Sequence, residues 1–253
     1  MHGSKSSTPL VPSGLRADAV PVDRPDLDAL HERFARDGRV VVPDVLDAGF
    51  ARELRTCIET WTRWALVTRI DGAHRDFDAA AIAAMAPAQL QPLQALIAAE
   101  TRHDMQYLYE RFPLHDIDYD PGALPGGLAH FRDLLRGGPF IAMARAISGC
   151  EDIAFGDAQV TRYRAGHFLT RHDDAHAHKQ RRVAYVLGLS EGWRPDDGGQ
   201  LQFLDAQDQV EHVVIPQFNT LTLFRVPCPH LVTAVSPFTD NARLSITGWL
   251  RAV

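Results

Sequence analysis

The stretch IAFGDAQVTRYRAGHFLTRHDD, residues 153–174, decides the fold of this chain. Before it, apolar residues recur at helical spacing, and after it short β-rich runs alternate with Gly, Pro, Asp and Asn. That texture is typical of an antiparallel sandwich or barrel. The stretch ends on His172-Asp173-Asp174, and in a regular strand His172 and Asp174 point to the same side because side chains alternate. The sequence therefore predicts a β-rich half that carries a His-x-Asp pair on one strand face.

Eight candidate strands follow from this pattern. They lie near residues 153–164, 168–172, 182–190, 200–204, 210–215, 219–226, 230–235 and 242–251. Eight β runs suit a double-stranded β-helix, the jelly-roll form of a small barrel. With the helices expected before residue 150, the predicted fold class is α+β, a jelly-roll barrel with N-terminal supporting helices.

The region before the barrel is predicted to be mainly helical. One apolar stripe stops at Gly38, a residue that readily takes the left-handed conformation ending a helix, and a short strand is expected at 39–43. A second stripe contains Leu54. A longer helix is expected to begin near Pro87 and to continue through Met105, Leu108, Tyr109 and Phe112.

Length and composition indicate one domain. The 253 residues, 45% of them hydrophobic, suffice for one substantial core. We expect a flexible N-terminal tail at 1–25 and a single domain at 26–253, with mainly helical support at 26–150 and the jelly-roll core at 151–253. A net charge of −6 argues against a broad nucleic-acid surface.

The cysteines and the N-terminus bear on location. Cys57, Cys150 and Cys228 are far apart and show no Cys-x-x-Cys spacing, which favours a reducing, cytoplasmic setting. The first 25 residues lack the uninterrupted apolar segment of a secretory signal or a membrane span. We therefore expect neither membrane nor nucleic acid as a partner.

The barrel region resembles the iron(II) and 2-oxoglutarate dependent oxygenases, specifically their prolyl 4-hydroxylase-like branch. The resemblance lies in the order and spacing of several segments, which are 163–169, 172–174, 181–187, 197–201 and 243–249. It implies the double-stranded β-helix, and it implies His172, Asp174 and His230 as the catalytic ligands of a ferrous ion, a set that leaves one face of the metal open. The alternative is a polar turn with an unrelated structural His230. The nearby His176 and His178 have no matching family position.

The resemblance also implies a co-substrate pocket. Arg243 would pair with the distal carboxylate of 2-oxoglutarate, and Ser245 would add a hydroxyl hydrogen bond. Tyr163 matches a family tyrosine near the co-substrate, although a core tyrosine is the competing interpretation. Relatives usually carry a further tyrosine where Gly188 stands, so Ser245, Tyr163 or, least well, Tyr185 is expected to replace it.

Two further pairs of residues are candidates for contact with a substrate. Arg181 and Arg182 fit a family basic position near the mouth of the site, and a solvated basic turn explains them equally well. Trp193 and Trp249 have the shape to stack on a proline ring, but packing residues are the commoner case. The turn at 196–199 is interpreted as scaffold.

The implied activity is hydroxylation of an unactivated C–H bond. It requires Fe(II), 2-oxoglutarate as co-substrate and dioxygen, with ascorbate as a further candidate cofactor. A prolyl residue in a protein or peptide is the first expected substrate, and a free amino acid or other small metabolite is the alternative. A non-catalytic metal or carboxylate sensor, or a cupin-like binding module, is a second class of function. A zinc hydrolase is disfavoured, since no general base accompanies the ligands in a recognised arrangement. The oligomeric state is not predicted.

Overall fold

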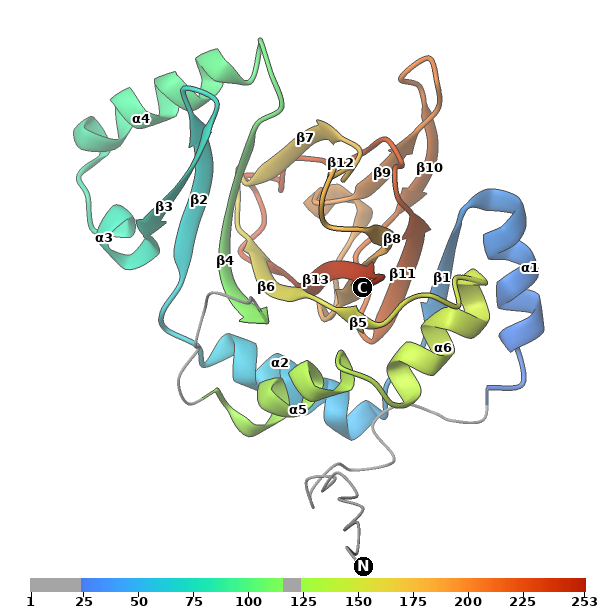
Figure 1. Ribbon diagram of the computed structural model, residues 1–253. Coiled ribbons are helices and arrows are strands. Elements are labelled where there is room, and N and C mark those ends of the chain that lie inside the picture. Colours follow the sequence, from blue (N-terminus) through green and yellow to red (C-terminus); the bar gives the residue numbers. More distant parts are fainter. Residues whose placement is uncertain (1–23, 116–123) are drawn as a thin grey trace, which may run out of the picture.

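The barrel at the centre of Figure 1 is one curled antiparallel sheet. The computed structural model describes residues 24–115 and 124–253, so nearly all of the predicted tail at 1–25 lies outside it. In the described residues thirteen strands pair, with a main path in the order β1-β11-β8-β13-β6-β4-β7-β12-β9-β10. The double-stranded β-helix predicted from the sequence is confirmed.

The strands after residue 150 lie close to the predicted positions. They are β5 (Phe155–Gly156), β6 (Ala158–Tyr163), β7 (Phe168–His172), β8 (Arg181–Gly188), β9 (Leu201–Leu204), β10 (Val210–Val214), β11 (Thr220–Arg225), β12 (His230–Val232) and β13 (Arg243–Arg251). Each run alternates or is bounded by turn-forming residues, which is why pattern alone located them.

The first half contributes strands as well as helices. It contains α1 (Leu27–Asp37), β1 (Arg39–Pro43), α2 (Ala48–Glu59), β2 (Ala65–Ile70), β3 (Ala73–Asp78), α3 (Ala79–Ala83), α4 (Pro87–Glu100), β4 (Tyr107–His115), α5 (Gly126–Leu134) and α6 (Pro139–Ser148). Gly38 and Gly149 end α1 and α6 in the left-handed conformation, with φ of 66° and 69°. Four strands from this half join the sheet, and of these only the one at 39–43 was predicted.

The predicted long helix from Pro87 through Phe112 is wrong beyond Glu100. The chain leaves α4 there and returns as β4, which pairs with β2, β6 and β7. Tyr107 and Tyr109 belong to the apolar cluster inside the barrel, while Leu108 and Phe112 pack in the cluster on the other face. This alternation is that of a strand, and the helical spacing of the apolar residues was coincidental.

Two apolar clusters lie on the two faces of the sheet. The larger one joins α1, α2, α5 and α6 to strand residues such as Ile246. Figure 1 shows α2 and α5 below the barrel and α1 and α6 beside it. The smaller cluster consists of strand residues of the barrel interior, among them Tyr163, Phe203 and Phe224. The helices brace one face, and the other face is left to form a pocket.

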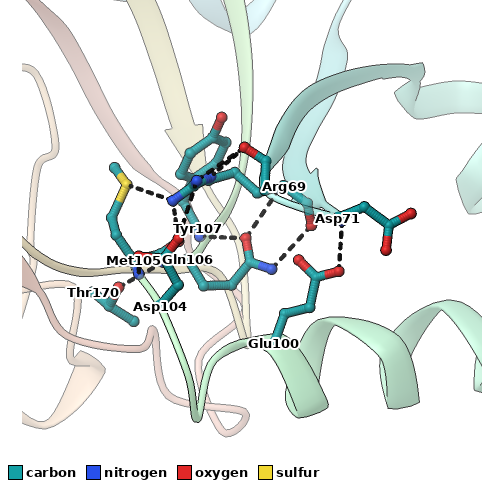
Figure 2. Close-up of polar contacts among 9 residues, drawn as sticks. Arg69, Asp71, Glu100, Asp104, Met105, Gln106, Tyr107 and Thr170 are labelled. Carbon is teal, nitrogen blue, oxygen red and sulfur yellow. Dashed lines mark hydrogen bonds and ion pairs between the residues drawn. The ribbon is translucent and has the colours of Figure 1, made fainter.

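Gln106 ties the β2–β3 hairpin to the barrel (Figure 2). Its buried side chain accepts hydrogen bonds from the Arg69 and Tyr107 amides, at 3.0 and 2.8 Å, and donates to the Arg69 carbonyl at 3.0 Å. Its own amide donates to the Thr170 hydroxyl at 2.7 Å. Through its side chain and its backbone amide together, Gln106 thus joins β2, β4 and β7.

Candidate functional site

Three of the predicted site residues meet at the β7–β12 edge of the barrel. His172 ends β7 and lies opposite His230, the first residue of β12, with ring centroids 4.0 Å apart. Asp174 completes the group, each of its oxygens lying 3.6 Å from one imidazole Nε2. One ligand atom from each residue lies within 4.8 Å of the others. In residues 24–115 and 124–253, no other group of His, Cys, Asp or Glu side chains has this geometry.

Asp174 reaches the group by a route that the sequence did not predict. Strand alternation was the expected reason for choosing it over Asp173, but β7 ends at His172. Asp174 instead takes a left-handed backbone conformation, with φ of 64°, which an aspartate tolerates better than most residues. Asp173 is used elsewhere, since its carboxylate accepts the Ala175 amide at 2.9 Å and its carbonyl accepts the Cys228 amide at 3.2 Å.

Both imidazoles are oriented by backbone carbonyls. His172 Nδ1 lies 3.0 Å from the Thr170 carbonyl and His230 Nδ1 lies 2.7 Å from the Cys228 carbonyl. A carbonyl only accepts, so each Nδ1 donates and each Nε2 keeps a free lone pair on the side of Asp174. Burial and the neighbouring His172 lower the pKa of His230 to about 4. At neutral pH His230 is therefore in the uncharged form that binds metals.

A buried arginine lies deeper in the barrel. Arg243 is 4% exposed, pairs across the sheet with Tyr163, and places its guanidinium carbon 5.0 Å from the centre of that ring. Burial lowers its pKa, and in the described part of the chain no carboxylate forms an ion pair with it. A buried cation without a counter-charge is costly, which indicates that the counter-charge comes from a ligand.

The space beside this guanidinium is here called the Arg243 pocket. It is lined by residues that include Val186, Gly188, Thr220, Thr222, Arg243 and Ser245. The Ser245 hydroxyl is 2.8 Å from the Thr161 hydroxyl. A Cβ at Gly188 would lie 2.3 Å from the Gln217 carbonyl oxygen, so this position has no room for a side chain. A tyrosine at position 188 would therefore clash with the backbone of the neighbouring loop at Gln217.

The three hydroxyls expected to replace the tyrosine at position 188 lie in different parts of the barrel. The Tyr185 hydroxyl donates to the Asp157 carbonyl at 2.9 Å, and its ring packs in the cluster on the helix side, so it is outside the pocket. Tyr163 is inside the barrel, and burial raises the pKa of its hydroxyl well above the usual value. Its ring stacks on Tyr109 at 5.0 Å. Tyr109 was missed because β4 was taken for a helix.

Comparisons with known proteins agree with this geometry. The sequence model of the 2OG-Fe(II) oxygenase superfamily matches residues 158–251, the segment that contains all three clustered ligands and Arg243. Residues 158–251 are therefore similar to the 2OG-Fe(II) oxygenase superfamily. A curated relative, prolyl 3-hydroxylase OGFOD1 of Mus musculus, is 32% identical over 117 residues, which are 44% of this chain. The chain spans about a fifth of that relative's length, 21%.

Several solved structures share the fold of this chain. A prolyl-4-hydroxylase from Pseudomonas putida is 22% identical, with a TM-score of 0.56 over 90% of this chain and 99% of that one. A 2OG-Fe(II) oxygenase family oxidoreductase from Burkholderia pseudomallei is 14% identical, with a TM-score of 0.57 over 90% and 94%. A Trichoplax adhaerens prolyl hydroxylase, solved with a hypoxia inducible factor peptide fragment, is 14% identical, with a TM-score of 0.52 over 89% of each chain.

The remaining predicted residues divide between the site and the scaffold. Arg181 lies over the Trp249 ring and donates to the Asp174 carbonyl at 2.8 Å, whereas Arg182 pairs with Asp152 at 2.8 Å. Trp193 donates to the Gly198 carbonyl at 2.9 Å and so belongs to the turn at 196–199.

His176 and His178 lie outside the clustered group and are exposed. In the described ranges, no helix is long and apolar enough to cross a membrane.

Proposed function

We propose that this protein is an oxygenase that hydroxylates an unactivated C–H bond with Fe(II) held by His172, Asp174 and His230. The observation that carries the proposal is the pairing of two features inside one barrel: a three-residue group with free Nε2 lone pairs, and a buried arginine without a carboxylate. Tyr163 lies within electrostatic reach of both, since the charges of Asp174 and Arg243 each shift the pKa of its hydroxyl. A small diacid spanning the two is the ligand that this arrangement fits.

The donor set suits a ferrous ion. Two imidazoles and one carboxylate on one side of an ion are the facial arrangement of non-haem iron oxygenases. When bound, the iron with 2-oxoglutarate and dioxygen supplies the oxidising chemistry. The protein holds two imidazoles through their Nδ1 hydrogen bonds, presents the Arg243 guanidinium and the Tyr163 hydroxyl to a carboxylate, and surrounds them with the apolar barrel interior.

Turnover of the co-substrate tests this proposal. The protein, freed of metal and then given Fe(II), 2-oxoglutarate and dioxygen, is expected to consume oxygen and form succinate, and substitution of a ligand is expected to stop both. Binding of metal and 2-oxoglutarate without any turnover, in the presence of a broad substrate extract, would favour the non-catalytic sensor instead.

A prolyl residue in a protein or peptide is the substrate class that we propose first. It is supported by the names of the relatives, a prolyl 3-hydroxylase and two prolyl hydroxylases, one of them solved with a peptide. A small molecule remains the second candidate, because a 2-oxoglutarate dependent epimerase from nogalamycin biosynthesis shares the fold with a TM-score of 0.52. Mass spectrometry of a cellular extract incubated with the enzyme separates them: added oxygen on a peptide supports the first, and on a metabolite the second.

The cytoplasmic location of the protein and the use of ascorbate as a cofactor both remain predictions. Cys57, Cys150 and Cys228 are all unpaired in the structure, which is compatible with a reducing compartment. Whether ascorbate sustains turnover is answered by running the same oxygen-consumption assay with and without it.

A further inference from the structure

Asp174 carries its carboxylate on an unusual stretch of backbone. It lies beyond the end of β7 and has a positive φ of 64°, so no strand pairing holds its peptide group. Two hydrogen bonds do so instead. The Cys228 amide donates to the Asp173 carbonyl at 3.2 Å, and Arg181 Nη1 donates to the Asp174 carbonyl at 2.8 Å. The second comes from a side chain, so a substitution can remove it.

Arg181 is itself held in place by Trp249. Its guanidinium carbon is 3.4 Å from the centre of the indole, close enough for a stacked cation–π pair. Trp249 lies on β13 and is fixed by pairing with Ala184 on β8, the strand that Arg181 begins. The stacked pair is shielded from solvent. Arg181 Nε and Trp249 Nε1 are both buried, and neither has a hydrogen-bond partner in the described residues. Buried donors of this kind are uncommon and call for a functional explanation.

The neighbouring arginine differs in every one of these respects. Arg182 points to the other side of β8, leaves 36% of its side chain exposed and pairs with Asp152, whose side chain is 54% exposed. It has no contact with the clustered ligands. The two adjacent arginines therefore have different contacts. Arg181 binds the backbone carbonyl of Asp174, and Arg182 forms an ion pair at the surface.

We propose that Arg181 is a positioning residue, which fixes the Asp174 carboxylate for metal binding by holding the Asp174 carbonyl from a Trp249 platform. The inference rests on the proposed metal site. An aspartate side chain has only two rotatable bonds, so the direction of its carboxylate depends on the orientation of its backbone. Groups that orient metal ligands without touching the metal typically change metal affinity by about 10-fold to 100-fold when removed.

The test measures metal binding rather than turnover. Apo protein is titrated with Co²⁺ alone, followed by its visible d–d absorption, and the apo melting temperature is recorded in parallel. Arg181→Met keeps the aliphatic stem on the indole but removes the donor, and Arg182→Met is the matched control. We expect the Co²⁺ dissociation constant to rise about 10-fold or more in Arg181→Met, with an altered d–d spectrum, and to stay within about 2-fold of wild type in Arg182→Met.

Each outcome decides the question. A role limited to fold stability would lower the apo melting temperature of Arg181→Met but leave the dissociation constant and the spectrum unchanged, and that result overturns the inference while the metal site stands. A wild-type protein that binds no Co²⁺ overturns the metal site and the inference together. Should Arg181→Met not fold, Arg181→Leu carries the test, since it keeps an apolar stem and removes the donor to the Asp174 carbonyl. A dissociation constant raised several-fold in that variant supports the inference, and one equal to wild type refutes it.

Discussion

The two ends of the barrel interior differ in how completely the protein satisfies its own polar groups. At the β7–β12 end, two imidazoles and a carboxylate face one another, and each imidazole Nδ1 is bonded to a carbonyl. At the β13 end, Arg243 is buried against an aromatic ring with no carboxylate among the described residues. The first end is pre-organised by the chain alone, whereas the second depends on a ligand for its counter-charge.

Removing a ligand at the first end should have the largest effect. Substitution of His172 or His230 by Ala is expected to lower iron-dependent succinate formation about 100-fold or more, because even residues that only orient ligands contribute about 10-fold to 100-fold. The exposed His178→Ala is the control and should behave as wild type. Succinate formation retained with iron bound would contradict the ligand assignment.

Substitution of Arg243 at the second end should have opposite effects on 2-oxoglutarate binding and on the stability of the ligand-free protein. Arg243→Met is expected to raise the dissociation constant of 2-oxoglutarate about 30-fold or more, which corresponds to about 2 kcal/mol for a lost buried charge pair. It should also raise the melting temperature of the ligand-free protein, since an uncompensated buried charge is replaced by an apolar side chain. Calorimetric titration and thermal melts measure the two effects.

A partly buried arginine provides the contrast. Arg162 is only 15% exposed in its side chain and is paired with the buried Glu110. Arg162→Met should therefore lower the melting temperature, because it deprives a buried carboxylate of one partner. If Arg243→Met were equally destabilising, Arg243 would have a structural partner, and the difference between the two ends would disappear.

The Tyr163 hydroxyl should have an intermediate effect. Tyr163→Phe is expected to weaken 2-oxoglutarate binding about 10-fold, the scale of one hydrogen bond to a charged group. Tyr185→Phe should leave this affinity unchanged and cost about 1 kcal/mol of stability, because the Tyr185 hydroxyl donates to the Asp157 carbonyl on the other side of the sheet. Equal losses of affinity in both variants would argue against a direct role for Tyr163.

Ser245 should have the smallest effect. Its hydroxyl already has a partner in Thr161, so Ser245→Ala is expected to change 2-oxoglutarate affinity by about 3-fold or less. A loss as large as that of Tyr163→Phe would instead identify Ser245 as the hydroxyl that compensates for Gly188.

The sequence predicted those parts of the molecule that depend on local pattern. Alternation and turn residues located the strands after Ile153, and Gly38 marked the end of α1. Asp71-Gly72, both with positive φ, form the turn of the β2–β3 hairpin, and this pair was a usable hairpin signal that was overlooked. Strand β4 was misread because its apolar residues also fit a helical period.

Other features were beyond the sequence because distant contacts create them. The positive φ of Asp174 depends on where Arg181 and Cys228 lie, and the absence of a side chain at Gly188 follows from the Gln217 carbonyl. The burial of Arg243 without a carboxylate is likewise a property of the assembled barrel. The identity of the site residues was predictable, but the means by which the chain orients them was not.

Gln106 gives the hairpin a direct mechanical link to the metal-binding edge. Thr170 receives the Gln106 amide on its hydroxyl, and its carbonyl receives His172 Nδ1. Figure 2 shows the bonds from Arg69 to Gln106 and from Gln106 to Thr170, and with the His172 bond three hydrogen bonds in series connect the hairpin to one imidazole. Loading the site with metal should slow hydrogen exchange of the Arg69 amide, which bonds to Gln106, so a backbone position outside the barrel can report on occupancy within it.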